Sequence, residues 1–233
     1  MRPAAEEFEA RDVTSVEDEK FDLIYPPQLR ALSSVFWTPV QVAAEAARLL
    51  IVAPGTRVLD VGCGPGKFCL VAASLTDGHF TGVEQRSSLV AAANDAAERL
   101  GVVDVEFLEA NITEVSFGAY DAFYIFNPFE ENMSEAYKID SAVTLSPHLF
   151  RRYTTYVAGE LAAKPLETRV VTYMGYADEI PGCYSCEAAL FDDDLKLWVK
   201  TREHELDPQL EQLGLKARRS YRGSLGWVPP RSF

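Results

Sequence analysis

The chain has 233 residues, of which 48% are hydrophobic and 24% are charged, so it is long enough to bury one substantial core and is unlike a disordered protein. It contains no run of eighteen uncharged apolar residues, and its first residues lack the apolar stretch of a signal peptide, which predicts a cytoplasmic protein without membrane contact. The formal net charge of −13 makes duplex nucleic acid an unfavourable partner.

The two ends of the chain differ in composition from the middle. Residues 1–20 are acidic and poor in large apolar side chains, so we expect a flexible acidic segment there. Residues 21–233 are expected to form a single domain that ends in an irregular tail. The basic residues between Lys216 and Arg222 lie in that tail and are more typical of a solvated surface than of a binding site.

The first predicted elements alternate between helix and strand. After a loop at residues 21–27, apolar residues repeat at helical spacing over residues 40–51. Residues 57–61 then form a short branched run typical of a strand, and residues 68–73 favour a helix. Residues 80–84 predict a second strand. This succession of strand, turn, helix and strand indicates a parallel pair joined by a helix.

The same alternation continues along the chain. A helix with Ser87 or Ser88 as its cap is expected to end at Gly101. Strands are predicted at residues 103–108 and 120–126, and a helix at 151–163.

The last predicted elements are strands. One is expected at residues 169–174, and two more, 185–191 and 195–201, flank the acidic turn Asp192-Asp193-Asp194 as a hairpin. The sequence therefore predicts an α/β protein with a doubly wound, mostly parallel seven-stranded sheet and an antiparallel C-terminal hairpin.

Glycines alternate with other residues directly after the first strand, at Gly62, Gly64 and Gly66. Glycine lets the backbone turn sharply and approach a ligand at the carboxyl edge of a parallel sheet. An NAD-binding oxidoreductase needs a glycine where Lys67 stands, so this alternative is less favoured. Asp60, at the end of the strand, suits a cationic amino group better than a pyrophosphate.

The run from Asp60 to Gly66 resembles the first motif of class I, Rossmann-like, S-adenosylmethionine-dependent methyltransferases, and the resemblance extends over about residues 36–201. It implies S-adenosylmethionine as the cofactor, with its amino group oriented by Asp60 and its ribose hydroxyls accepted by Glu84. It also implies that Asn111 contacts the adenine amino group. The other residues expected to bind the cofactor are Thr38, Gly62, Cys63, Gly64, Gly66, Gln85, Ile112 and Asn127.

Asn127-Pro128-Phe129 follows the fourth predicted strand and resembles the Asn-Pro-Pro-Tyr/Phe motif of enzymes that methylate amine nitrogens, with one proline fewer. The resemblance implies that Asn127 and the Pro128 carbonyl accept hydrogen bonds from a target amino group, while Phe129 stacks on it. These three are the expected catalytic residues, and the alternative is a simple turn after a buried strand. Were the target a lysine, Glu130 or Glu131 would be a candidate to remove its proton.

Cys183 and Cys186 are spaced like half of a zinc site, but the sequence offers no second pair, so we expect no metal. The leading hypothesis is a methyltransferase that acts on a nitrogen of a protein side chain, because an acidic enzyme favours a basic protein over nucleic acid. A small-molecule or nucleic-acid methyltransferase and a noncatalytic S-adenosylmethionine-binding module are the alternatives. The sequence fixes neither the acceptor nor the oligomeric state.

Overall fold

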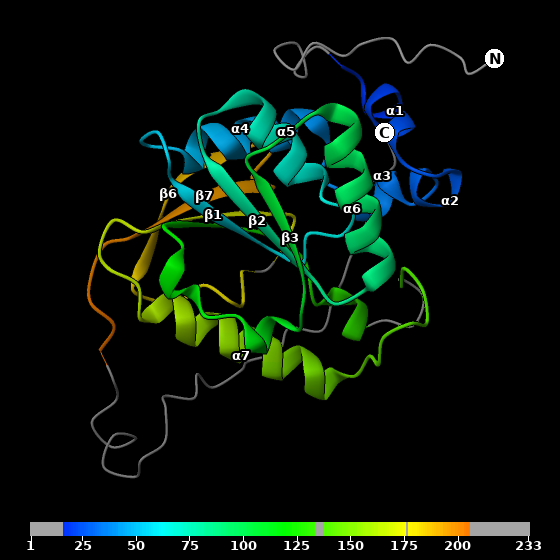
Figure 1. Ribbon diagram of the computed structural model, residues 1–233. Helices are drawn as coiled ribbons and strands as arrows, with labels where there is room; N and C mark the ends of the chain where they lie inside the picture. Colours follow the sequence, from blue (N-terminus) through cyan, green and yellow to red (C-terminus); the bar gives the residue numbers. More distant parts are fainter. Residues whose placement is uncertain (1–15, 134–137, 176, 206–233) are drawn as a thin grey trace, which may run out of the picture.

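The structure is a computed structural model that describes residues 16–133, 138–175 and 177–205. One seven-stranded sheet, in the order β3-β2-β1-β4-β5-β7-β6, runs through its centre (Figure 1). The strands are β1 (Arg57–Val61), β2 (His79–Glu84), β3 (Val105–Glu109), β4 (Ala122–Phe126), β5 (Arg169–Tyr173), β6 (Tyr184–Leu190) and β7 (Leu195–Lys200). The predicted fold class is confirmed.

The strand directions place a crevice at one edge of the sheet. The strands from β3 to β5 pair in parallel, and β7 then pairs antiparallel with both β5 and β6. The chain moves outward from β1 through β2 to β3 and then returns to place β4 on the other side of β1. Where the strand order reverses in this way, the loops after the two central strands separate and leave room for a ligand.

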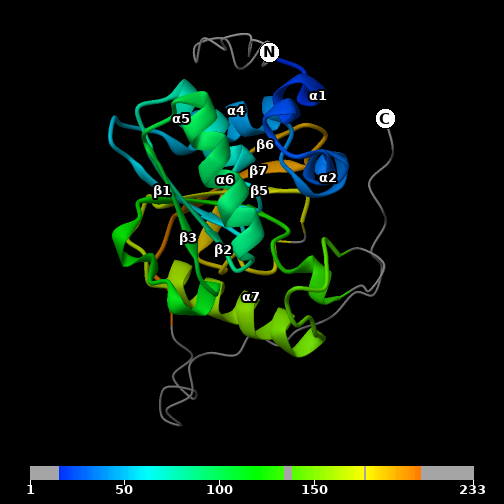
Figure 2. The same ribbon diagram turned by 45° about the vertical axis from the view of Figure 1, so that its right-hand side comes forward.

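Helices cover both faces of the sheet. In Figures 1 and 2, α4, α5 and α6 lie on one face and α7 lies across the other. The helices are α1 (Asp18–Phe21), α2 (Pro27–Arg30), α3 (Ser33–Phe36), α4 (Val40–Leu50), α5 (Lys67–Leu75), α6 (Ser87–Leu100) and α7 (Pro147–Ala162), and 3-10 turns occur at Asp22–Ile24, Ile112–Glu114, Phe117–Ala119 and Glu130–Asn132. None of the helices in the described ranges has the length and apolar character that crossing a membrane requires.

Several predicted boundaries were wrong for local reasons. The loop expected at residues 21–27 consists of short helical turns. Neither serine caps α6, because Arg86 occupies the N-cap position. The strand expected at 103–108 is β3, which starts two residues later. Helix α7 begins at Pro147, four residues before the predicted start, because the Ser146 side chain accepts a hydrogen bond from the Leu149 backbone NH.

The flexible segment expected at residues 1–20 is packed against the domain over its last residues, whereas residues 1–15 lie outside the described ranges. The basic cluster from Lys216 to Arg222 lies outside them as well. Val16 is buried, and α1 begins at Asp18. The acidic residues near this end therefore have a structural role that their composition alone did not indicate.

Lys67 fixes the N-terminal helices to the rest of the fold. Its side chain is 2% exposed, and Nζ lies 2.6 Å from an Asp18 carboxylate oxygen and 2.7 Å from one of Asp22. Nζ also donates to the Ser33 hydroxyl at 3.2 Å and lies over the Phe21 ring. Because Lys67 is the first residue of α5, it ties residues 18–33 to the helix that follows the glycine loop.

Asp60 belongs to the face of β1 that packs under α5. Side chains alternate along the strand, so that Val58 packs with the helices α4 to α6 and Leu59 with α7. Asp60 is 3% exposed, and the Cys69 thiol donates to its Oδ2 at 3.5 Å. Burial raises the pKa of Asp60 to about 8; the Cys69 hydrogen bond opposes this shift and the charge of Glu84 adds to it.

Replacing Lys67 by methionine is expected to destabilise the fold strongly, since it leaves the buried Asp22 carboxylate without its cation. We expect a loss of about 3–5 kcal/mol in the free energy of unfolding, measured by urea denaturation. The control is Arg57→Met, which removes an exposed ion pair with Asp121 and should have a far smaller effect. Equal effects of the two substitutions would contradict the anchoring role of Lys67.

The raised pKa of Asp60 predicts a pH-dependent stability. An unfolded chain loses this proton near pH 4, but the folded chain holds it up to about pH 8, so the stabilisation is full below about pH 4 and is lost as the pH rises towards 8. Asp60→Asn removes the titration. We expect the free energy of unfolding of the variant, relative to wild type, to rise by up to about 1.4 kcal/mol per pH unit across this window. A difference that stays constant with pH would refute the assignment.

Candidate functional site

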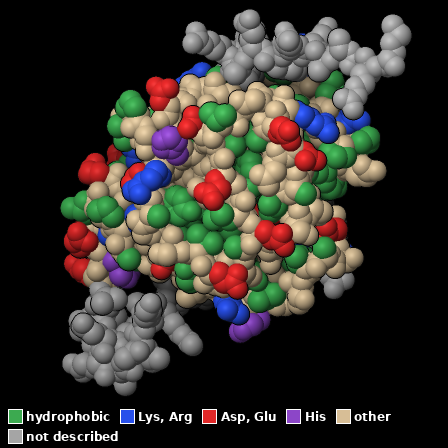
Figure 3. All heavy atoms as spheres, in the orientation of Figure 1, with side chains coloured by type: hydrophobic (Ala, Val, Ile, Leu, Met, Phe, Trp, Pro, Cys, Tyr) green, Lys and Arg blue, Asp and Glu red, His purple; other side chains and the backbone are tan. Residues whose placement is uncertain are grey.

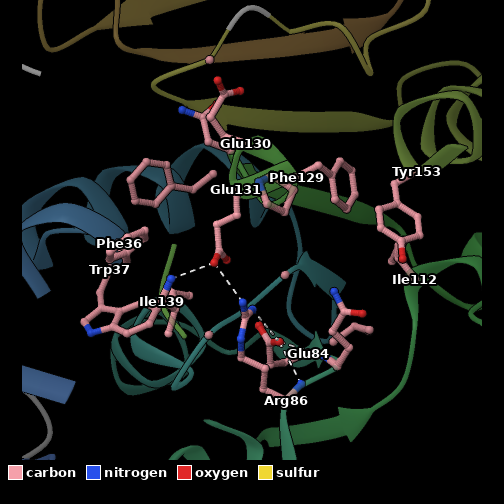
Figure 4. Close-up of a pocket in the computed structure, with 18 of the residues that line it drawn as sticks. Phe36, Trp37, Glu84, Arg86, Ile112, Phe129, Glu130, Glu131, Ile139 and Tyr153 are labelled. Carbon is pink, nitrogen blue, oxygen red and sulfur yellow. Dashed lines mark hydrogen bonds and ion pairs between the residues drawn. The ribbon is translucent and has the colours of Figure 1, made fainter. Parts of the chain in front are cut away.

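A cavity of about 520 Å³ opens at the carboxyl ends of β1, β2, β3 and β4. Its walls come from the loops that directly follow these strands, together with α3 and α7 (Figure 4). The predicted site residues on its walls are Gly62, Gly64, Glu84, Gln85, Asn111, Ile112, Asn127, Pro128 and Phe129. The volume lies in the range of sites that hold a small molecule or cofactor.

The glycine loop is in close contact with two other segments. Gly62 has a φ of +77°, and a Cβ added there would lie 2.5 Å from Cβ of Pro128. Gly64 has a φ of +55°, and a Cβ there would lie 2.6 Å from the Trp37 ring. The Trp37 indole NH donates to the Leu29 carbonyl at 2.9 Å, which fixes the ring over the loop. Only glycine combines this backbone with these contacts.

Glu84 is a buried carboxylate at the end of β2. It is 6% exposed, and its Oε1 accepts hydrogen bonds from the backbone NH groups of Gln85 and Arg86, both at 2.9 Å. Burial raises the pKa of Glu84, while the bond from the Arg86 NH and the Arg86 charge oppose this shift. Since Oε1 is engaged by the backbone, Oε2 is the oxygen that remains for a ligand in the cavity.

Arg86 links the end of β2 to the segment after β4. Its guanidinium lies 3.6 Å from Glu84, 2.9 Å from Glu131 and 3.0 Å from Asp140, and it is itself buried. Glu131 also accepts a hydrogen bond from the Ile139 backbone NH at 2.8 Å, as Figure 4 shows. The arginine thus holds Ile139 on the cavity wall. Glu131, engaged twice, is not the free base that the sequence offered as a candidate.

Sequence reasoning missed Arg86. The sequence placed it only two residues after Glu84, at the end of a predicted strand. Its other two carboxylate partners, Glu131 and Asp140, lie more than forty residues further along the chain. The role of Arg86 in linking these loops is therefore visible only in the folded structure.

Asn111 lines the cavity but is occupied as a helix cap. Its Oδ1 accepts from the Thr113 backbone NH at 3.1 Å and from the Thr113 hydroxyl at 2.9 Å. Its backbone NH donates to Glu114, which completes a capping box, and its Nδ2 donates to the Tyr153 hydroxyl at 2.8 Å. The predicted hydrogen bond from an adenine amino group to Asn111 therefore has no free acceptor to receive it.

Four predicted cofactor residues are absent from the cavity wall: Thr38, Asp60, Cys63 and Gly66. Asp60 lies behind the glycine loop on the α5 side of the sheet, as described above. The Thr38 hydroxyl is hydrogen-bonded to the Tyr124 hydroxyl at 3.0 Å inside the core. These residues lie outside the wall of this cavity, and the cofactor contacts predicted for them stay predictions.

Asn127, Pro128 and Phe129 all line the cavity. Asn127 has a φ of 39°, a conformation that asparagine tolerates better than most residues, and its carbonyl accepts from the Glu130 NH at 3.3 Å in a turn. Its side chain packs so closely on Gly175 that an added Cβ there would lie 2.4 Å from Oδ1. The motif is thus both a turn and a wall of the cavity, and its catalytic role stays a prediction.

Glu130 extends the same turn. Burial raises its pKa, and the neighbouring charge of Asp178 adds to the effect. It is the carboxylate beside the motif that does not pair with Arg86. Cys183 is buried and Cys186 exposed, both are free thiols, and the described residues contain no group of three or more potential ligands able to hold a metal ion.

Comparisons with known proteins agree with this architecture. Residues 53–138 match the family description "Methyltransferase domain". A segment of 74 residues is 38% identical to the 23S rRNA (uracil(1939)-C(5))-methyltransferase RlmD of Xanthomonas axonopodis pv. citri, covering 32% of this chain and 16% of that protein. A segment of 55 residues is 44% identical to the tRNA (guanine-N(7)-)-methyltransferase of a Synechocystis species, covering 23% of this chain and 26% of that protein.

Two solved structures share the fold at low identity. The RNA methyltransferase of Salinibacter ruber in complex with S-adenosyl-L-homocysteine has a TM-score of 0.51 and 22% identity, over 73% of this chain and 97% of that one. TrmN from Thermus thermophilus has a TM-score of 0.52 and 21% identity, over 70% of this chain and 48% of that one.

These relatives require one correction. The expectation that the acceptor could be a protein and that duplex nucleic acid is an unfavourable partner is contradicted, because the matched curated relatives are named for rRNA and tRNA. The remaining findings agree with one another. Residues 53–138 match a methyltransferase domain, and the sheet order is that of the Rossmann-like fold shared with the methyltransferase structures above.

Proposed function

We propose that this chain transfers a methyl group from S-adenosylmethionine to a nitrogen of an RNA base. The observation that carries the proposal is the cavity at the carboxyl ends of β1 to β4, in a chain that shares short segments with rRNA and tRNA methyltransferases. The chain spans about a sixth and a quarter of the length of those two relatives, so the choice of base is argued from the site itself.

Each wall of the cavity fits one part of the cofactor. Glu84 offers Oε2 to the ribose hydroxyls, and Gly62 and Gly64 leave room for the methionine portion beside Trp37. Ile112, 6% exposed, provides an apolar surface for the adenine ring. When bound, the cofactor supplies an electrophilic methyl group on a sulfonium. The protein then has to position the acceptor and exclude water, and such positioning contributes roughly 7–11 kcal/mol to a two-reactant step.

The turn after β4 is the part of the wall that suits an amine. Asn127 and the Pro128 carbonyl provide oxygen acceptors for N–H groups, and Phe129 provides an aromatic edge. Glu130, with its raised pKa, is the nearby group best able to take up the proton that the methylated nitrogen releases. A base nitrogen that carries hydrogen meets these requirements.

The acidity of the chain limits how RNA is bound. Acidic side chains are scattered over the face in Figure 3 and basic ones are few, so this face offers no broad surface for a phosphate backbone. A base that leaves its stack and enters a pocket needs fewer phosphate contacts than a bound duplex. We therefore place the target in a loop, a bulge or a chain end.

Incubation with radiolabelled S-adenosylmethionine and fractionated cellular RNA is expected to give label that survives protease and is released by nuclease. Nucleoside analysis of the product should show an N-methylated base. Asn127→Ala should lower the rate by about tenfold or more while cofactor binding is retained, and exposed Asn94→Ala, on α6 away from the cavity, is the matched control. Label in protein, or a base methylated on carbon, would overturn the proposal.

The affinity for S-adenosylhomocysteine is expected to depend on pH through Glu84. Only the carboxylate accepts both ribose hydroxyls, so affinity falls as the pH drops through the raised pKa of Glu84. Arg86→Met removes a charge that lowers this pKa, and the fall should therefore move to higher pH. Calorimetric titrations of S-adenosylhomocysteine between about pH 5 and pH 8 measure this shift in the affinity profile. Glu84→Gln should flatten the profile, exposed Arg57→Met should leave it unchanged, and identical profiles for wild type and Arg86→Met would refute the coupling.

A further inference from the structure

The end of the cavity near Asn111 and Ile112, where adenine is proposed to bind, offers hydrogen-bond donors instead of the acceptor expected at Asn111. Both hydrogen bonds that Oδ1 of Asn111 accepts come from Thr113, one from its backbone and one from its hydroxyl. An amide oxygen has two lone pairs, and both are therefore in use. The amide orientation is fixed by these bonds, because the Thr113 backbone NH can only donate.

The other end of the same amide orients Tyr153. Nδ2 of Asn111 donates to the Tyr153 hydroxyl oxygen at 2.8 Å. A hydroxyl that accepts a hydrogen bond from a group without lone pairs keeps its own proton for another partner. Tyr153 is 5% exposed and lines the cavity, and Figure 4 shows its hydroxyl end next to Ile112.

The position of the tyrosine ring is determined by packing. Tyr153 comes from α7, and its ring lies 5.3 Å from that of Phe129 at an angle of 44°. The two rings therefore support each other between the adenine end of the cavity and the turn after β4. A buried ring held in this way loses little freedom when its hydroxyl meets a ligand.

The groups available at this end are thus donors: the Tyr153 O–H and the second N–H of Asn111. Adenine presents ring nitrogens N1, N3 and N7 as acceptors, whereas its exocyclic amino group is a donor. Given the proposed cofactor site, we infer that the Tyr153 hydroxyl, oriented by Asn111, donates a hydrogen bond to a ring nitrogen of adenine. Tyr153 then helps to determine nucleoside specificity from α7, whereas the other proposed cofactor residues follow the strands of the sheet.

Calorimetry with S-adenosylhomocysteine and three analogues, in which N1, N3 or N7 of adenine is replaced by C–H, tests this inference. Wild type should bind one analogue about three- to tenfold more weakly than the parent compound, which is the range of one neutral hydrogen bond. Tyr153→Phe should bind the parent compound more weakly by a similar factor and should bind that one analogue as wild type does. Tyr156→Phe is the matched control, because it removes a hydrogen bond from α7 to the Val115 carbonyl away from the cavity.

Two results would overturn the inference alone. One is unchanged affinity of Tyr153→Phe for S-adenosylhomocysteine, and the other is an equal loss for all four ligands, which would mean that the hydroxyl acts only on the structure. Failure of wild type to bind S-adenosylhomocysteine would be a different outcome, since it would overturn the proposed function and this inference with it.

Discussion

The tight contact of the glycine loop with its neighbours is the constraint on which the rest of the site depends. Gly62 and Gly64 adopt left-handed backbone conformations, and Pro128 and Trp37 lie where their side chains would be. This contact brings three distant segments together: the loop after β1, the turn after β4 and the segment around Trp37 between α3 and α4. The cavity is formed by the loops around this contact.

Two buried cations then hold the remaining segments in place. Lys67 secures the N-terminal helices, and with them Trp37, through Asp18 and Asp22. Arg86 secures the segment after β4 through Glu131 and Asp140. Buried charges are costly to desolvate, so each is stable here because carboxylates surround it. In a chain with a net charge of −13, carboxylates are plentiful, and these two cations neutralise four of them, Asp18, Asp22, Glu131 and Asp140.

The net charge of this chain is a poor guide to its acceptor. Net charge describes the average field, which salt screens over about 8–10 Å, and it says little about a single base inside a pocket. Local chemistry at the pocket wall decides what enters. The donors at Tyr153 and Asn111 and the acceptors at Asn127 and Pro128 lie at different parts of one wall and would serve different ligands, a cofactor purine and a target amine.

The sequence by itself determined the fold class and the identity of the loops that form the site. Hydrophobic periodicity marks the order of strands and helices, and the glycines mark the tight turn, because both are local properties of the chain. Periodicity does not mark where an element begins, since a cap such as Ser146 acts through one side-chain hydrogen bond.

Only the tertiary structure decided what each site residue contacts. Asp60 and Asn111 matched the expected pattern in type and place, yet the alternation of β1 turns Asp60 behind the loop and a capping box occupies Asn111. Arg86 and Tyr153 gave no comparable signal, because Glu131, which Arg86 contacts, and Asn111, which Tyr153 contacts, each lie more than forty residues away in the chain. Hydrogen-bond partners across such separations depend on how the loops converge in space, and a linear pattern does not carry that information.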